Sequence, residues 1–334
     1  MTDDERYMLR ALELASLGMG CTAPNPMVGA VLVHEGRIIG EGYHHRSGMP
    51  HAEVMAVASV QERDLLSQST LYVTLEPCSH YGKTPPCAEL IIREHIPRVV
   101  VATQDPFPQV SGRGIQLLMD AGIEVIVGVL EGEARRLNAP FITTQTKHRP
   151  FVSLKWAQSL DGFIDRLRED RSESPEIFSS PLQQRLVHAE RMRHDAILVG
   201  YRTALLDDPQ LTNRLWYGRS PLRIVLDPRL ELPRDLRLFR DQLAPTWVIH
   251  LRDVAPPAEP MDGVRYLALD GERIEPSALL RLLYREGVQS LLVEGGASTL
   301  ESFLDSQLYD QLLVEVCPRP LGKGVPAPAI RDLE

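Results

Sequence analysis

One histidine, one glutamate and two cysteines stand where they could build a hydrolytic metal site. His51 precedes Glu53 by two residues, and Cys78 and Cys87 follow a short apolar run. An imidazole and two thiolates occupy three corners of a zinc tetrahedron and leave the fourth for water, whose protons a nearby carboxylate can move. This set of groups is typical of a hydrolytic deaminase.

The spacing of the two cysteines departs from the common deaminase signature. Eight residues separate Cys78 from Cys87, whereas that signature places two residues between its cysteines. Either the turn-rich insert bulges outward and returns, or one cysteine is not a ligand and His80 is a substitute. Singly, each of the four residues has an ordinary interpretation as a helix cap, a solvated carboxylate or a buried thiol. Together, each beside a proline or at the end of an element, they indicate a metal site.

The N-terminal half alternates helices and strands in a way that brings these residues together. We expect helices over residues 4–17, 51–61, 88–94, 114–120 and 131–139, and strands over 28–33, 38–43, 70–75, 98–102 and 124–127. This alternation predicts a sheet covered by helices. His51 and Glu53 then open one helix, and Cys87 lies at the start of another. They converge if both N-termini, which stabilise negative charge, point into one pocket.

The length of 334 residues favours two domains. Residues 143–150 are polar and end in a proline before a fresh strand at 151–157, so we place the boundary there, with domains at 1–146 and 147–334. In the second half we expect a helix over 181–193 and strands over 196–199, 222–226, 247–250 and 290–293. The highly charged residues 166–174 predict a solvated loop.

The strand at 290–293 runs into Glu294-Gly295-Gly296-Ala297-Ser298-Thr299. Two glycines before a helix N-terminus allow backbone N–H groups to approach an anion, so the segment resembles a phosphate-binding turn. An ordinary tight turn between strand and helix is the alternative. The chain has no Gly-x-Gly-x-x-Gly motif, so a Rossmann cofactor site is not supported.

Composition excludes several classes of function. The net charge of −9 gives no general attraction to nucleic acid or to an anionic membrane. No apolar run approaches the roughly 18 residues of a membrane span, and the acidic start is unlike a signal peptide. We therefore predict a cytoplasmic protein without nucleic-acid or membrane partners. In a reducing compartment Cys78 and Cys87 fit thiolate ligands better than a disulfide, and Cys21 and Cys317 are read as ordinary small residues.

Several motifs resemble those of the bifunctional riboflavin-biosynthesis family, which fuses a zinc-dependent pyrimidine deaminase domain to an NADPH-dependent reductase domain. The matching segments are Ala-Pro-Asn-Pro-x-Val-Gly at 23–29, Pro-His-Ala-Glu at 50–53, the stretch 72–87, Gln-Asp-Pro at 104–106 with the glycines at 112 and 114, Ser-Leu-Asp-Gly at 159–162, and Val-Glu-Gly-Gly at 293–296. The resemblance covers nearly the whole chain. In that family the long insert between the cysteines is normal.

The resemblance implies an α/β fold with a cytidine-deaminase-like three-layer α/β/α domain, followed by a dihydrofolate-reductase-like α/β domain. It implies zinc ligands at His51, Cys78 and Cys87, and a proton shuttle at Glu53. The implied substrate is 2,5-diamino-6-(5-phosphoribosylamino)pyrimidin-4-one, which is deaminated before NADPH reduces its ribosyl group to ribityl. Implied substrate contacts are Asn25, Lys83, Arg191, Leu211, Arg214 and Glu294, with Lys83, Arg191 and Arg214 suited to the phosphate. Implied NADPH contacts are Ala157, Thr203, Asp207, Gly296, Ala297, Ser298 and Thr299.

Two departures from the family concern the reductase domain. Family members usually carry a Ser-x-Trp-Ile segment, whereas Ser174–Phe178 contains no tryptophan, and relatives are expected to continue for another strand beyond Glu334. An active deaminase with a degraded, scaffold-only reductase domain is therefore the alternative function. A zinc-stabilised structural or nucleic-acid-binding protein is disfavoured, because structural zinc normally has four protein ligands. The resemblance also suggests a homo-oligomer, dimer or tetramer, assembled through the reductase domain.

Overall fold

The chain folds as two compact units, Met1–His148 and Arg149–Glu334. The computed structural model describes residues 1–81, 85–107 and 111–330. The boundary expected at 146/147 falls inside helix α6 (Ala139–Lys147). The division between the units lies within the polar residues 143–150, but the first of these residues are helical: Thr143 and Thr144 are buried, and the Thr144 hydroxyl donates to the Pro140 carbonyl one turn earlier.

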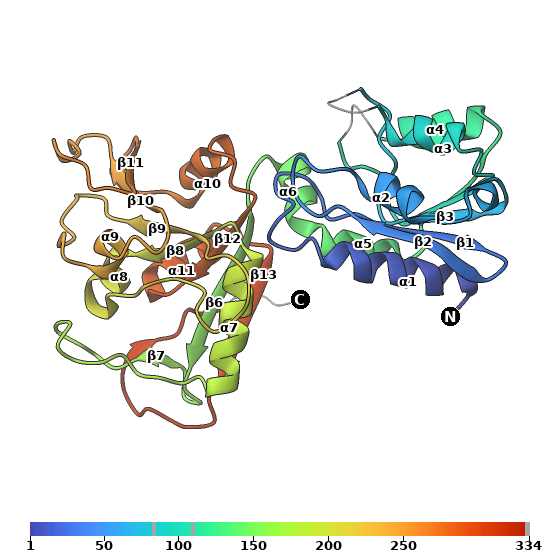
Figure 1. Cartoon of the computed structure of the whole chain (residues 1–334). Coiled ribbons are helices and arrows are strands. Elements are labelled where there is room, and N and C mark those ends of the chain that lie inside the picture. Colours follow the sequence, from blue (N-terminus) through green and yellow to red (C-terminus); the bar gives the residue numbers. More distant parts are fainter. Residues whose placement is uncertain (82–84, 108–110, 331–334) are drawn as a thin grey trace. The chain divides into compact units, whose positions relative to one another are not determined.

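A five-stranded sheet organises the first unit (Figure 1). Strand β1 is antiparallel to both of its neighbours, and the remaining pairs are parallel. Glu35 and Gly36 both have positive φ, which suits the tight turn of the expected hairpin. The strands are, in spatial order, β2 (Arg37–Tyr43), β1 (Gly29–His34), β3 (Thr70–Val73), β4 (Arg98–Val101) and β5 (Glu124–Val127).

Alternating side chains along these strands build two cores, one on each face of the sheet. Leu71 and Val73 pack in the core that contains residues of α2 (Ala52–Ser59), α3 (Cys87–Arg93) and α4 (Arg113–Asp120). Tyr72 packs in the opposite core with α1 (Asp3–Ser16) and α5 (Glu131–Leu137). A short 3-10 helix, η1 (Arg63–Gln68), precedes β3. The result is the expected three-layer α/β/α arrangement.

A seven-stranded parallel sheet organises the second unit. Its strands are, in spatial order, β11 (Val264–Leu269), β10 (Thr246–Leu251), β9 (Leu222–Leu226), β8 (Ala196–Gly200), β12 (Ser290–Glu294), β6 (Phe151–Gln158) and β13 (Gln311–Val316). A small antiparallel ribbon joins β7 (Phe163–Asp165) to β14 (Val325–Pro326). Of the seven strands from β7 to β13, the expectations included β8, β9, β10 and β12 and left out β7, β11 and β13.

Helices cover both faces of this parallel sheet. One core combines strand residues with α10 (Pro276–Arg285) and α11 (Ala297–Asp305). The opposite core includes α8 (Tyr201–Asp207) and α9 (Arg237–Arg240). The expected helix α7 (Pro181–Arg193) begins with a capping box at Ser180 and has proline in its first turn. Among the helices of the described residues, none is both long and apolar enough to cross a membrane.

Candidate functional site

The imidazole of His51 and the thiols of Cys78 and Cys87 form a single cluster. Nδ1 of His51 lies 3.6 Å from Sγ of Cys78 and 3.3 Å from Sγ of Cys87, and the three ligand atoms all lie within 4.8 Å of one another. Ligands about 2.3 Å (sulfur) and about 2.1 Å (nitrogen) from a tetrahedral ion are roughly 3.6 Å apart. The donor set and its spacing therefore fit zinc.

Two helix N-termini point at this cluster. His51 is the N-cap residue of α2, and Cys87 is the first residue of α3. The backbone N–H of Cys87 donates to Sγ of Cys78 at 3.2 Å. The pKa of the Cys78 thiol is lowered, first by its hydrogen bond with the Cys87 side chain and then by the one with His51. The insert between the cysteines therefore returns to the site. His80 is exposed and lies outside the cluster.

Glycines on β2 let α2 lie directly against the sheet and so fix the position of His51. A Cβ added to Gly42 would lie 2.4 Å from the backbone nitrogen of Ala56, and one added to Gly40 would lie 2.6 Å from the Ala56 carbonyl oxygen. Real Cβ atoms do not approach backbone so closely, so any side chain at either position would move the helix.

Glu53 lies in the first turn of α2 and is 3% exposed. Burial, assisted by the neighbouring Cys78, raises the pKa of its carboxyl to about 7. A carboxyl that exchanges protons near neutral pH is suited to general acid–base catalysis. Its side chain, unlike a solvated surface glutamate, is enclosed beside the metal-ligand cluster.

His44 is a buried histidine beside the cluster that none of the sequence motifs indicated. It is 3% exposed, and its ring meets the His51 ring edge-on with centroids 5.7 Å apart. Its Nδ1 lies 3.1 Å from the Pro50 carbonyl and must donate to it, so Nε2 accepts the 3.2 Å hydrogen bond from the Asn25 amide nitrogen. Asn25 is thereby oriented beside the cluster with its carbonyl oxygen free to accept.

Two buried polar side chains hold the loops around this site. The Asn138 amide both accepts from and donates to the Met27 backbone at 2.8 Å, which fixes the loop that carries Asn25. The carboxylate of Glu76, two residues before Cys78, accepts from the backbone N–H groups of Asp105, Gly112, Gly114 and Ile115. The motif around Glu76 was recognised in the sequence, but this bracing role was not.

The second unit contains a cavity of about 820 Å³ at the carboxyl ends of its central strands. Open parallel sheets commonly bind ligands there. Its walls include residues of β6, β8 and β12 together with segments before and after them in the chain. Ten of the residues expected to contact substrate or cofactor line it: Ala157, Arg191, Thr203, Asp207, Leu211, Arg214, Glu294, Gly296, Ala297 and Ser298. Thr299 is buried but is not part of the wall.

The turn between β12 and α11 forms one end of this cavity. Gly295 and Gly296 have φ of 102° and 76°, values that favour glycine. A Cβ on Gly295 would lie 3.1 Å from the Thr203 methyl, so the turn packs closely against α8. The start of α11 therefore lines the cavity at the turn that the sequence suggested for anion binding.

Arg191 and Glu294 form a buried ion pair in the cavity wall. The guanidinium donates to both carboxylate oxygens, at 3.1 and 2.7 Å, and to the Thr212 carbonyl at 3.1 Å. Within the described residues, three of the five guanidinium donors of Arg191 are therefore used, and the expected phosphate contact at Arg191 stays a prediction. Arg214 makes one side-chain hydrogen bond, to the Thr212 hydroxyl at 2.9 Å, and retains donors for an anion.

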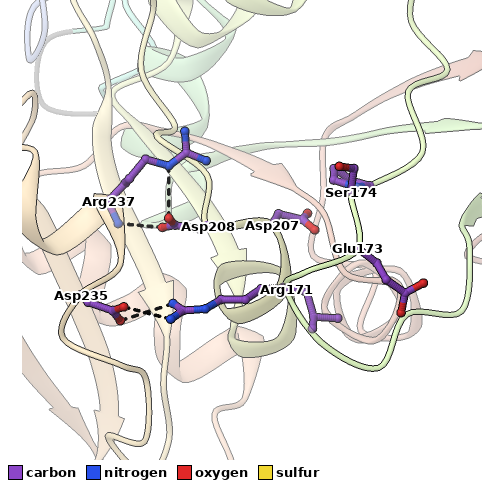
Figure 2. A pocket seen from close by; sticks show the side chains of 9 residues that line it. Arg171, Glu173, Ser174, Asp207, Asp208, Asp235 and Arg237 are labelled. Atoms are coloured by element: carbon purple, nitrogen blue, oxygen red, sulfur yellow. Dashed lines mark hydrogen bonds and ion pairs between the residues drawn. The ribbon is translucent and has the colours of Figure 1, made fainter.

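A second, polar pocket of about 540 Å³ shares Pro175, Leu206 and Asp207 with the larger cavity. Figure 2 shows its two ion pairs, Arg171 with Asp235 and Arg237 with Asp208. The arginines are about half exposed. Pairs this accessible contribute little to stability.

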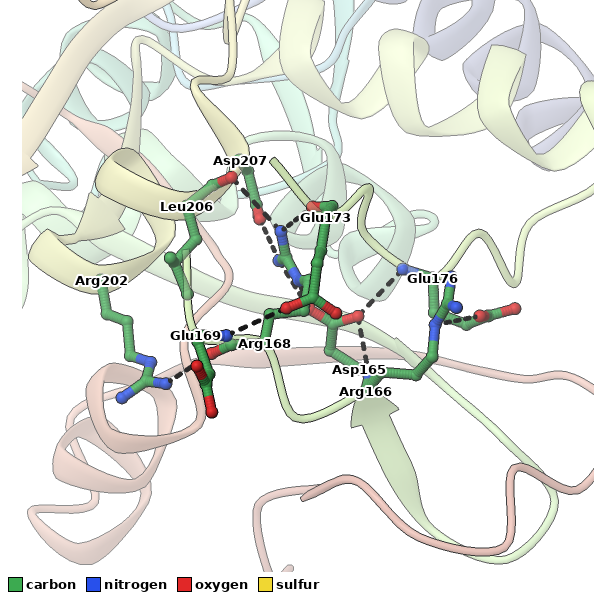
Figure 3. A network of polar contacts seen from close by, with 9 residues as sticks. All are labelled: Asp165, Arg166, Arg168, Glu169, Glu173, Glu176, Arg202, Leu206 and Asp207. Atoms are coloured by element: carbon green, nitrogen blue, oxygen red, sulfur yellow. Dashed lines mark hydrogen bonds and ion pairs between the residues drawn. The ribbon is translucent and has the colours of Figure 1, made fainter. Parts of the chain in front are cut away.

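The wall between the two pockets is the charged segment that was expected to be a solvated loop. Most of it is exposed, but Arg168 is only 6% exposed, so the expectation was wrong at this residue. Figure 3 shows its guanidinium between Asp165 and Asp207, with further bonds to the carbonyls of Glu173 and Leu206. Asp207 is therefore held by an arginine.

The segment without the family tryptophan still contributes to the larger cavity. Ile177 and Phe178 line it, as do Val325 and Pro326 of β14. The Asp161 carboxylate accepts from the backbone N–H groups of Leu321 and Gly322, which ties the Ser-Leu-Asp-Gly turn to the approach to β14. Lys83 lies outside the described residues.

Comparison with known proteins accounts for both units. A model described as the RibD C-terminal domain matches residues 150–332, and one described as the cytidine and deoxycytidylate deaminase zinc-binding region matches residues 1–103. The riboflavin biosynthesis protein RibD of Aquifex aeolicus is 44% identical over 324 residues, covering 96% of this chain and 89% of that protein.

Solved structures agree with this assignment. A Thermotoga maritima protein named as a diaminohydroxyphosphoribosylaminopyrimidine deaminase/5-amino-6-(5-phosphoribosylamino)uracil reductase is 42% identical, with a TM-score of 0.86 over 97% of this chain and 89% of that one. RibD of Acinetobacter baumannii is 34% identical, with a TM-score of 0.86 over 99% and 91%. The expected cytidine-deaminase-like and dihydrofolate-reductase-like folds are confirmed. With both units matched over most of their length, the chain belongs to the RibD family, whose members join a deaminase and a reductase of riboflavin biosynthesis in one polypeptide.

Proposed function

We propose that the first unit hydrolytically deaminates 2,5-diamino-6-(5-phosphoribosylamino)pyrimidin-4-one and that the second unit uses NADPH to reduce the ribosyl group of the product to ribityl. The observation that carries the proposal is the cluster of His51, Cys78 and Cys87 with the buried Glu53 in the adjoining helix turn. The Thermotoga relative, which is named for both reactions, supports the choice of substrate.

Glu53 is the proton carrier of the deamination. A zinc ion held by the three ligands would supply a water of lowered pKa. Glu53 takes a proton from this water and passes it to the ring nitrogen, and then carries the second proton to the departing amino group. Water and the ring amine thereby become a ring carbonyl and ammonia.

Asn25 forms a hydrogen bond with the edge of the pyrimidine ring. Because its amide nitrogen donates to His44, its carbonyl oxygen is left to accept from an amino group of the substrate. Deamination replaces that amino group by a carbonyl oxygen. Two acceptors, this oxygen and the Asn25 carbonyl oxygen, would then face each other, which favours release of the deaminated ring. The proposed phosphate contact of Lys83 remains a prediction from the sequence.

The cofactor lies along Gly296, Ala297 and Ser298 in the second unit. NADPH would supply the hydride. The N-terminus of α11 suits its phosphate groups, because the first N–H groups of a helix have no partner within the helix and these residues line the cavity. Ala157 and Thr203 line the same cavity, and Asp207 is placed at its wall by Arg168. Thr299 lies behind the cavity wall, where it packs against the end of β8. A Cβ added to Gly200 would lie 2.4 Å from its hydroxyl oxygen.

Arg214 is the main contact for the sugar phosphate. Arg191 neutralises Glu294, and this buried pair forms a fixed side of the substrate pocket. Leu211 is 3% exposed and lines the cavity beside them. The remaining guanidinium donors of Arg214 give the phosphate a charge-assisted site.

A paired assay on the purified chain tests the proposal. Diaminopyrimidine phosphate is added, ammonia release is measured, and NADPH oxidation is followed in the same sample together with the zinc content. We expect one zinc per chain and both reactions in sequence. Ammonia release without NADPH oxidation would select the degraded-reductase alternative, and stoichiometric zinc with neither reaction would favour a structural role.

Assembly as a homo-oligomer through the second unit, a cytoplasmic location, and the lack of nucleic-acid and membrane partners also remain predictions. Light scattering on the purified chain measures the oligomeric state, and cell fractionation measures the location. A monomer at assay concentration would contradict the first of these.

A further inference from the structure

His188 is a buried histidine in the wall of the reductase cavity to which the proposed reaction assigns no role. It lies on α7, one helical turn before Arg191, is 5% exposed and lines the cavity. Neither the sequence motifs nor the expected contacts included it. Its position among Arg191, Arg214 and Glu294 places it where the substrate is proposed to bind.

A single backbone contact fixes the tautomer of this ring. The N–H of Arg214 lies 2.9 Å from Nδ1 of His188. A backbone N–H only donates, so Nδ1 carries the lone pair and the proton of the neutral ring is on Nε2. Burial, followed by the positive charges of Arg191 and Arg214, lowers the pKa of His188 to about 4, against smaller opposing effects of Glu294 and the Asn213 side chain.

The same contact ties the ring to the residue that carries the free guanidinium. The side-chain amide nitrogen of Asn213 donates to the Tyr217 carbonyl at 3.0 Å and so stabilises the loop. The next residue, Arg214, donates its backbone N–H to His188. Arg214 and Arg191 both bond to Thr212, one through the hydroxyl and the other through the carbonyl. Thr212, His188 and Arg214 therefore form one rigid corner of the cavity.

Donors are left over in this corner. Among the described residues, Glu294 and the Thr212 carbonyl take three of the five N–H donors of Arg191, whereas Arg214 uses one of its side-chain donors. Within 3.5 Å, the described residues make one hydrogen bond to the His188 ring, and it uses Nδ1. The Asn213 side chain interacts with the His188 ring, and its buried Oδ1 has no hydrogen-bond partner among the described residues. The Nε2–H lies beside a guanidinium, an arrangement suited to a phosphate oxygen, which would compete with this amide for the proton.

We infer that His188 is a substrate-binding residue of the reductase unit, a neutral imidazole whose Nε2–H donates a hydrogen bond to the sugar phosphate beside Arg214. This inference rests on the proposed function for the identity of the ligand. In the proposed reduction the carbon receives hydride and the attached heteroatom receives a proton, and a ring that stays neutral at physiological pH is a poor donor of that proton. His188 therefore affects the binding of the phosphate rather than the chemical step.

Reductase kinetics with deaminated substrate at saturating NADPH test this role. His188→Leu removes the donor and is expected to raise KM for the phosphorylated substrate about tenfold, the usual effect of one hydrogen bond to a charged group. The value of kcat and the KM for NADPH stay within about twofold. His188→Gln, whose amide can donate, restores part of the affinity. With the dephosphorylated substrate, wild type and His188→Leu should have the same KM.

The matched control is His194→Gln on the same stretch of chain. His194 is also buried, but its ring nitrogens contact the Glu190 carbonyl and the Ser153 hydroxyl, and it does not line the cavity. It should lower stability without changing KM. An unchanged KM in His188→Leu, or an equal loss for both forms of the substrate, overturns the inference because either result leaves only a structural role.

Nitrogen NMR of the histidine rings separates this inference from the proposed function. The His188 signal, assigned by its loss in His188→Gln, should show the Nε2–H tautomer and shift on addition of ribitol 5-phosphate but not of ribitol. A shift with both compounds or with neither contradicts phosphate binding. Because this readout needs no turnover, it still decides the role of His188 if the wild-type chain oxidises no NADPH.

Discussion

The zinc site and the reductase cavity reach their shapes in opposite ways. The zinc ligands and Glu53 come from one stretch between residues 51 and 87, and their reactive atoms contact one another directly. The reductase cavity takes its walls from residues between 155 and 326, and ion pairs hold many of them. A metal site requires particular ligand atoms at particular positions. A cavity requires only that some side chains complete its wall.

This difference predicts different responses to substitution. Each ligand of the zinc site supplies one of the three protein donors found in the cluster, so removing any of them would leave the ion with two. In the cavity wall, Ile177 and Phe178 line the position where the family pattern led us to expect a tryptophan, and Arg168 holds the adjoining loop. Substitutions in the zinc site should therefore abolish deamination, whereas substitutions in the cavity wall should lower the reductase activity to different degrees.

Cys87→Ala is expected to have the largest effect. It removes a ligand, so zinc content falls and ammonia release drops roughly 10³-fold or more, because the ion contributes several kcal/mol. NADPH oxidation with deaminated substrate should persist, since that cavity is in the other unit. Cys21→Ala, at an exposed cysteine, is the matched control. Full ammonia release by Cys87→Ala would remove this residue from the ligand set.

Glu53→Gln should separate metal binding from proton transfer. The variant keeps the three ligands, so we expect normal zinc content with a loss of deamination of about 10²–10⁴-fold. Ammonia release and zinc content are measured on the same sample. Glu62→Gln, at an exposed glutamate paired only with Arg37, should behave like the wild type. Normal ammonia release from Glu53→Gln would contradict the proton-carrier role.

Arg168→Met measures how far ion pairs build the cavity wall. It leaves the carboxylates of Asp165 and Asp207 without their common partner, and we expect a loss of about 3 kcal/mol in unfolding free energy. KM for NADPH should also rise, because Asp207 lines the cavity. The three tryptophans all lie in the second unit, so their fluorescence reports its unfolding.

The control for this prediction is Arg171→Met in the same segment. Arg171 pairs with Asp235 at the surface, where an ion pair contributes about 0–1 kcal/mol. Equal stabilities of the two variants would mean that the Arg168 network does not support the wall.

The smallest effect concerns pH. The pKa of His188 is about 4 in the folded chain and 6.5 when unfolded, so between these values the unfolded chain binds the extra proton. Stability therefore falls as pH decreases from about 6.5 to 4. Between pH 7 and 4.5, the unfolding free energy of the wild type should fall by about 2 kcal/mol more than that of His188→Gln, with allowance for partial solvation of the ring. Urea unfolding followed by tryptophan fluorescence measures the difference, and parallel curves would refute it.

The expectations from sequence were most successful where chemistry restricts residue type. The histidine, the glutamate and the two cysteines were identified from their types, and the alternation of helices and strands gave the layered fold of the first unit. Errors came where polarity was taken as exposure. The polar stretch from residue 143 is helical, and Arg168 is buried within a charged segment. In both cases partners distant in sequence or along the helix satisfy the polar groups.

By itself, the sequence determined which groups could bind zinc, where the strands and most helices of the first unit lie, and which family the motifs resemble. Only the tertiary structure decided that the insert returns Cys87 to Cys78, that Glu76 braces the neighbouring loop, that Glu294 occupies Arg191, and that Arg214 fixes the His188 tautomer. The physical reason is that metal chemistry requires particular atoms, which a sequence displays. Hydrogen bonds and ion pairs can be made by many residues, and which ones meet depends on how the chain folds.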